Sequence, residues 1–193
     1  MSELEEFHQS LIADVQGDAD AMGFYTQEAF FEKVGEILTE AGEIDECDYC
    51  HFEGTRSLLK DGTRRKVSLQ VSGYSGDPRD TGGDLALILC DFQITPEVRK
   101  TDGKHLNGQF SKLVEFLKFA RKQEFLDELE ETSNAAQLAD LIQQRWSAIE
   151  KFKLVYVTNS DNRAKVDARP AGQIDGKPVT YSVWDLKRLQ AFV

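Results

Sequence analysis

The stretch that decides the fold runs from residue 66 to residue 93 and reads KVSLQVSGYSGDPRDTGGDLALILCDFQ. Apolar residues occupy every second position from Val67 to Val71, which is the pattern of a strand with one buried face. Residues 85–90 form a continuous apolar run, as expected of a strand that is buried on both faces. Gly, Asp and Pro between them are typical of a turn. We therefore predict a hairpin whose second strand lies inside a sheet and ends at Asp91.

Composition limits the class of protein. The chain has 193 residues, the size of one domain, and a net charge of −11, which opposes nucleic-acid binding unless basic residues cluster locally. No apolar run approaches the roughly 18–20 residues that span a bilayer. The acidic start, MSELEEFHQ, lacks the pattern of a signal peptide. Three cysteines do not suggest a disulfide framework, so we expect a cytoplasmic protein with reduced thiols.

Periodicity predicts the remaining elements. Ser2 and Glu5 have the spacing of a capping box at the start of a helix over residues 2–19, and Thr26 is expected to cap a second helix. We expect further helices over 109–130, 135–151 and 183–193, strands over 154–158, 165–168 and 178–181, and connecting segments over 42–54 and 101–108. This order favours an α/β domain in which helices flank a mixed central sheet.

The last predicted helix carries an apolar stripe. Leu186, Leu189 and Phe192 lie at helical spacing, and the chain stops directly afterwards. We therefore expect residues 1–193 to form a single domain at the N-terminal end of a longer chain.

Cys47, Cys50 and His51 match the C-x-x-C-H pattern of covalent haem attachment, and they could also supply three ligands to zinc. Haem attachment requires export, and no export signal is visible. A closed zinc site needs a fourth ligand, for which only weak carboxylate candidates lie nearby. We expect neither group, and ordinary packed or exposed thiols instead. The other histidines, His8 and His105, are far apart in the sequence and are predicted to be structural.

Aspartates gather in and after the turn that precedes the apolar run. Asp77, Asp80, Asp84 and Asp91 offer the oxygen ligands that Mg²⁺ and Mn²⁺ prefer. Aspartate is also an ordinary turn residue, and no neighbouring Lys or His is present to activate a nucleophile. We therefore predict that these aspartates are ordinary turn residues and not metal ligands.

Basic residues cluster just before the first predicted strand. Arg64, Arg65 and Lys66, with Arg56 and Lys60 nearby, could contact a phosphate backbone, or they could form the solvated end of a hairpin. Aromatic residues do not alternate with these charges, so the sequence shows no platform on which single-stranded bases would stack.

Two segments of the opening stretch resemble a known family. Residues 71–74, followed by a turn and residues 85–92, are similar to the N-terminal region of the abortive-infection phage-resistance proteins, and residues 4–7, 30–31 and 181–186 extend the likeness over nearly the whole chain. The resemblance implies a restriction-endonuclease-like fold of the PD-(D/E)XK class, in bacterial antiviral defence. Proteins of that family are longer than this chain.

In such nucleases, an Asp on one strand and an acidic-x-Lys pair on the next strand bind a divalent metal and activate water. The family pattern, I-D-G-F and then L-x-L-I-Q-S-K-Y, places the Asp at Ser72, the acidic or Gln position at Leu89 and the Lys at Asp91. Serine is a poor metal ligand, leucine is none, and aspartate reverses the charge of lysine. The resemblance thus implies the fold together with a degenerate site.

Two functions follow from this comparison. In the first, the degenerate domain needs no cofactor and serves in scaffolding, in dimerisation as a homo-oligomer, or in binding a partner or nucleic acid. In the alternative, a nuclease that depends on Mg²⁺ or Mn²⁺ has a migrated site, with Asp77 or Asp80 as the first carboxylate and Asp91 with Gln93 as the second pair.

Overall fold

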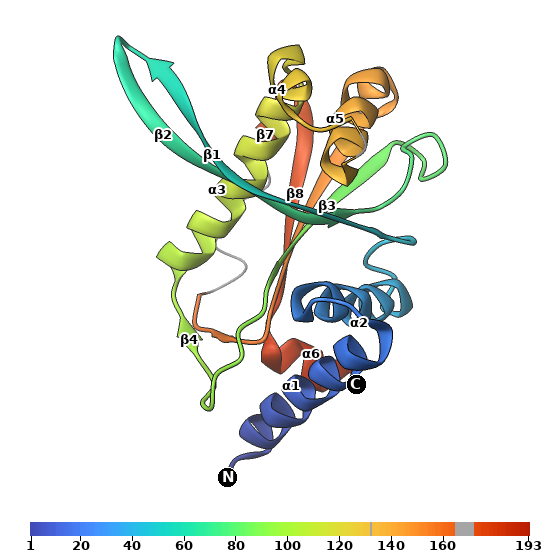
Figure 1. Cartoon of the computed structure of the whole chain (residues 1–193), viewed down its shortest axis with the longest axis vertical. Helices are drawn as coiled ribbons and strands as arrows, with labels where there is room; N and C mark the ends of the chain where they lie inside the picture. The colour runs from blue at the N-terminus through green and yellow to red at the C-terminus, as the bar shows by residue number, and fades with distance from the viewer. Residues whose placement is uncertain (132, 165–171) are drawn as a thin grey trace.

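The computed structural model describes residues 1–131, 133–164 and 172–193, and its centre is a six-stranded sheet (Figure 1). The strands lie in the order β1-β2-β3-β5-β8-β7. Parallel pairs join β3 to β5 and β5 to β8, and the other neighbours are antiparallel, so the predicted mixed sheet is confirmed. The strand bounds are Asp48–Lys60 (β1), Thr63–Tyr74 (β2), Asp84–Asp91 (β3), Lys151–Thr158 (β5), Gly172–Ile174 (β7) and Lys177–Trp184 (β8), and β4 (Lys100–Thr101) and β6 (Asp161–Asn162) form a separate pair.

Helices cover both faces of the sheet. Their bounds are Glu3–Met22 (α1), Thr26–Glu40 (α2), Gly103–Ala120 (α3), Gln123–Glu128 (α4), Asn134–Gln144 (α5) and Leu186–Phe192 (α6), with a short 3-10 turn at Trp146–Ala148 (η1). Helices α3, α4 and α5 pack on one face, and α1, α2 and α6 pack on the other. No helix in the described parts of the chain is both long enough and apolar enough to cross a bilayer.

Strand β3 is an interior strand, as predicted. Leu85, Leu87 and Leu89 belong to the apolar cluster beneath α3 and α5, whereas the alternate residues, such as Ile88, belong to the cluster beneath α1 and α2. Side chains of a strand point alternately to the two faces, so a continuous apolar run results when both faces are covered.

Strands β2 and β3 pair over a short length only. The ladder joins Gly73 to Ile88 and Tyr74 to Leu87, whereas β3 pairs with β5 along its whole length. Beyond Gly73, the Ser72 hydroxyl accepts a hydrogen bond from the Cys90 backbone N–H at 2.9 Å. The two strands therefore separate toward the C-terminal end of β3, and a cavity opens there.

The prediction of a linker over residues 42–54 is wrong in its second half, because β1 begins at Asp48. Its inward positions include Cys50 and Phe52, but Gly54 interrupts the apolar alternation and exposed charged residues surround it. Pairing with β2 supplies the stability that the local sequence lacks. The hairpin closes at Asp61 and Gly62, both at positive φ (52° and 74°), as a two-residue hairpin turn requires.

Helix bounds also differ from the periodicity. A loop is expected over residues 101–108, but Thr101 belongs to β4 and residues 103–108 form the start of α3, which Asp102 caps by accepting a hydrogen bond from the His105 N–H. The helix expected over 109–130 is broken at Arg121 and Lys122 into α3 and α4. The capping box of Ser2 and Glu5 is confirmed at α1.

The strands expected over 154–158 and 178–181 are confirmed as parts of the longer β5 and β8. The helix expected to reach residue 151 ends at Gln144, because residues 151–158 pair with β3. The last helix begins at Leu186 after an Asp185 cap, since residues 183 and 184 still pair with β5. The strand expected over 165–168 lies outside the described residues.

Candidate functional site

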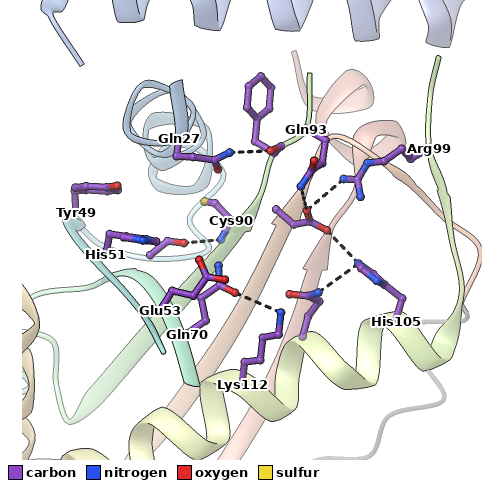
Figure 2. Close-up of a pocket in the computed structure, with 14 residues that line it drawn as sticks. Gln27, Tyr49, His51, Glu53, Gln70, Cys90, Gln93, Arg99, His105 and Lys112 are labelled. Atoms are coloured by element: carbon purple, nitrogen blue, oxygen red, sulfur yellow. Dashed lines mark hydrogen bonds and ion pairs between the residues drawn. The ribbon is translucent and has the colours of Figure 1, made fainter. Parts of the chain in front are cut away.

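A polar cavity of about 400 Å³ lies where β2 and β3 separate (Figure 2). Its walls come from β1, β2, the end of β3 and the segment after it, and the first turns of α3, with one residue from α2. The lining residues that define its chemistry are Tyr49, His51, Glu53, Gln70, Ser72, Asp91, Gln93, Arg99, His105 and Lys112. The cavity thus lies beside the carboxyl end of β3, a usual place for a ligand site in an α/β sheet.

Asp91 is the hub of this cavity. The Tyr156 hydroxyl donates to Asp91 Oδ2 at 2.6 Å, and His105 Nε2 lies 3.1 Å from the same oxygen. Arg99 Nη2 donates to Asp91 Oδ1 at 3.3 Å, and Gln93 Nε2 reaches that oxygen at 3.5 Å. Both carboxylate oxygens therefore have protein partners, and the side chain of Asp91 is only 11% exposed.

These contacts determine the protonation states of Asp91 and Tyr156. Burial by itself would raise the pKa of Asp91, but the hydrogen bond from Tyr156, the charge of Arg99 and the contact with His105 outweigh it and hold this pKa below its ordinary value. Burial, and then the Asp91 charge, raise the pKa of Tyr156. At neutral pH, Asp91 is therefore a carboxylate that accepts hydrogen bonds, and Tyr156 is a phenol that donates one.

The structure also places the other two positions of the expected nuclease pattern. Ser72 is 5% exposed, and its hydroxyl is engaged with the backbone of β3. Leu89 is fully buried in the apolar cluster beneath α3. Of the three positions, only Ser72 and Asp91 line the cavity.

The comparison with known proteins settles the family. The family model described as the abortive infection phage resistance protein N-terminal domain matches residues 30–191, which is most of the chain. The chain belongs to this phage-resistance family. Membership implies a role in phage defence. No curated protein and no solved structure matches the chain.

In this phage-resistance domain, the residues of the expected metal site do not fit a divalent cation. Hard cations take several oxygen ligands, whereas the three positions offer one carboxylate that is already hydrogen-bonded, one engaged hydroxyl and one buried leucine. In the parts of the chain that the structure describes, no group of three or more His, Cys, Asp or Glu side chains is placed to hold a metal.

The phage-resistance domain does not bring the residues of the alternative site together either. Asp77 and Asp80 lie in the turn before β3, and Asp91 ends that strand. The strand has eight residues, so its ends are about 23 Å apart at roughly 3.3 Å per residue. Asp77 also forms ion pairs with Arg79 at 2.8 Å and with Arg145 at 3.4 Å. Asp84, at the start of β3, lies at the same distant end.

The C-x-x-C-H residues do not share one site. Cys47 packs against the cluster beneath α1 and α2, whereas Cys50 lies in the cluster beneath α3 and α5. Burial raises the pKa of Cys47 to about 11 and the pKa of Cys50 to about 12, so both thiols are protonated at neutral pH. The His51 ring stacks on Tyr49 at a centroid distance of 6.4 Å, on the cavity wall.

Sequence reasoning misses the partners of Asp91. It assigns His105 a structural role and singles out neither Arg99 nor Tyr156, although the three converge on one carboxylate from the segment after β3, α3 and β5. The available signal is positional: Asp91 and Tyr156 lie near the carboxyl ends of β3 and β5, which are neighbouring parallel strands.

His8, which the sequence predicts to be structural, is buried, and its Nε2 contacts the Thr95 carbonyl oxygen at 3.0 Å.

Proposed function

We propose that this phage-resistance domain acts without cleaving nucleic acid. Its metal site is degenerate, and the surface around its polar cavity binds a partner in phage defence. The observation that carries the proposal is the state of Asp91, whose two carboxylate oxygens are held by Tyr156, His105 and Arg99. A carboxylate in this arrangement stabilises the end of β3 and leaves no free oxygen pair for a cation.

The order of elements supports a restriction-endonuclease-like arrangement. Helix α2 is followed by the antiparallel strands β1, β2 and β3, then by the crossover helix α3 and the parallel strand β5. The cavity opens where β2 and β3 separate, next to the two positions that the family pattern assigns to catalysis and that line it. We propose that the fold has kept this opening, whereas the residues at these two positions, Ser72 and Asp91, now accept hydrogen bonds from other groups of the protein.

Lys112 and Glu53 also line the cavity and are the remaining candidates to replace the lost residues. Lys112 Nζ donates to Gln70 Oε1 at 3.4 Å, on the wall formed by β1 and β2. Figure 2 shows Glu53 beside this pair and across the opening from Arg99 and His105, the two side chains that contact Asp91. Hydrolysis with metal assistance requires carboxylates that share one cation and a base beside the attacking water, so this separation favours a binding role for the cavity.

Cleavage assays test the proposal. Duplex DNA, single-stranded DNA and RNA would be incubated with the purified protein and Mg²⁺ or Mn²⁺, beside a restriction enzyme as a positive control. We expect no cleavage above that of a buffer control, and the same result for Asp91→Ala. Cleavage that requires metal and disappears in Asp91→Ala, Asp77→Ala or Glu53→Gln would contradict the proposal and would identify the residue responsible.

A further inference from the structure

The far end of the β1–β2 hairpin carries cations that form no ion pair with the described residues of the chain. Lys60, Arg64, Arg65 and Lys66 are all exposed, and none forms an ion pair with a carboxylate among the residues that the structure describes. Arg56, nearer the sheet, pairs with Glu128 at 3.0 Å. We call residues 60–66 the basic tip.

This arrangement is unusual for so acidic a chain, in which 34 acidic residues face 23 basic ones. Many cations elsewhere have carboxylate partners, as Lys33 has in Asp18 and Lys187 has in Asp161. Lys100, Lys104 and Lys122 are exposed without an ion pair among the described residues, but they do not form a cluster of four like the basic tip. The basic tip contains one carboxylate, that of Asp61 in the turn. Mutual repulsion of four neighbouring cations is unfavourable in the free protein, and an anionic partner would relieve it.

The ladder register places these cations on both faces of the two-stranded ribbon. Arg65 lies opposite Leu58, which packs toward α3, whereas Arg64 and Lys66 lie opposite Leu59 and Ser57 and therefore point to the other face. By the same alternation, Lys60 shares the face of Arg65. Each face of the ribbon thus presents two cations.

The ribbon projects from the domain. In Figure 1, the ends of β1 and β2 extend beyond the helices that cover the sheet. Strand β2 pairs with β3 only at its last residues, so the part of the ribbon that carries the basic tip has no third strand beside it. Residues 57–66, which are exposed except for the partly buried Leu58, form a narrow two-stranded arm that is available to enter a groove.

We propose that this arm enters the major groove of duplex DNA, where the basic tip contacts phosphates of the two flanking strands. The major groove of B-form DNA, about 12 Å wide, admits a two-stranded β-ribbon. Cations on both faces of such a ribbon reach the backbones on both sides of the groove. The deep and narrow major groove of A-form RNA excludes it, and the arm has no aromatic side chain for stacking single-stranded bases.

This inference goes beyond the proposed function, because the basic tip contributes no residue to the polar cavity and duplex DNA is a partner of this separate surface. Contacts to phosphates specify no sequence, so the arm binds duplexes of any sequence with a strong dependence on salt. For four phosphate contacts, the logarithm of the affinity falls with the logarithm of salt concentration with a slope of about −3.6. The affinity then falls about 150-fold between roughly 50 and 200 mM salt.

The test measures binding of fluorescent 20–30-base-pair duplex DNA by anisotropy, across a salt series and without divalent metal. The arm variant combines Arg64→Gln, Arg65→Gln and Lys66→Gln, and we expect it to weaken binding at least tenfold and to reduce the slope by about 2.7. Duplex RNA and single-stranded DNA of the same sequence are expected to bind several-fold more weakly than duplex DNA.

A matched control removes the same number of charges elsewhere. It combines Lys33→Gln, Lys151→Gln and Lys187→Gln, which lie on α2, β5 and α6, and we expect a change in affinity of less than threefold. Melting temperatures of both variants report on folding, and all six side chains reach the surface.

Equal losses in the two variants, or no binding of the wild-type protein to duplex DNA at about 50 mM salt, would overturn the inference. Equal affinity for duplex RNA would exclude the groove. If the wild-type protein bound poly-glutamate but not DNA, and the arm variant lost that binding, the partner of the basic tip would be an acidic protein and the inference would be wrong. If the wild-type protein cleaved DNA in the presence of metal and the arm variant bound DNA more weakly, the proposed function would be refuted, but the inference about the arm would be supported.

Discussion

Replacing Tyr156 by Phe tests the hydrogen bond at the hub of the cavity. The tyrosine is fully buried, and its ring packs near Phe110, so the substitution keeps the packing and removes only the hydroxyl. The lost bond, at 2.6 Å to the Asp91 carboxylate, is of the charged kind that contributes about 1.5–3 kcal/mol to the free energy of unfolding. For a domain of this size, we expect the melting temperature at pH 7 to fall by roughly 3–12 °C.

The pH dependence of the free energy of unfolding shows whether the loss in Tyr156→Phe comes from the hydrogen bond to the Asp91 carboxylate. The folded-state pKa of Asp91 is held below its ordinary value, so the stability that its contacts provide is present above the unfolded-state pKa and is lost as pH falls through the folded-state pKa. Tyr156→Phe raises that folded-state pKa, so the stability difference from the wild type should shrink toward about pH 3. Denaturant unfolding between pH 7 and pH 3 measures this difference.

A matched control is Tyr49→Phe, which removes a hydroxyl from the same cavity that has no hydrogen bond among the described residues. We expect it to change stability by less than about 0.5 kcal/mol. The account of Asp91 would be refuted by a Tyr156→Phe protein that is as stable as the wild type at pH 7. A stability loss that stays constant with pH would show that packing, and not the bond to the carboxylate, was removed.

Three further predictions concern the core, the site and the thiols. Leu87→Asp should unfold the domain, because an unpaired buried charge costs several kcal/mol, and a soluble variant with an unchanged melting temperature would show that β3 is not in the core. Ser72→Ala should lower stability by about 1–3 kcal/mol in denaturant unfolding, since the Cys90 N–H loses its partner, and an unchanged midpoint would show that this bond contributes nothing. Metal analysis of purified protein should find far less than one zinc per chain, because Cys47 and Cys50 lie in different apolar clusters, whereas one equivalent would require them to share a site.

Local sequence patterns predict those elements whose buried positions follow a regular spacing or a continuous run. The apolar run of residues 85–90 identifies an interior strand because both of its faces are covered, and the spacing of residues 2–19 identifies α1. Strand β1 is not predicted, because Gly54 and Arg56 at inward positions interrupt its apolar alternation. Its stability comes from pairing with β2, which follows it in the sequence. The break between α3 and α4 likewise depends on packing around Phe125, which periodicity does not encode.

The candidate site is predictable only as a location. The family pattern points to Ser72 and Asp91, and the structure places both beside one cavity. The donors that occupy Asp91 come from positions 8, 14 and 65 residues later in the chain, which are distances at which no local pattern operates. The migrated site is a reasonable alternative on the sequence alone, but the length of β3 separates its residues.

The central claim is that Asp91 is not a metal ligand. The measurement that tests it most directly is a titration of the wild-type protein and of Asp91→Ala with Mn²⁺, in which calorimetry measures the heat of binding. We expect no saturable binding in either protein at millimolar Mn²⁺, because Tyr156, His105 and Arg99 already occupy the Asp91 carboxylate. Saturable binding of about one Mn²⁺ per chain that is lost in Asp91→Ala would show that this carboxylate is a metal ligand, and would contradict the account.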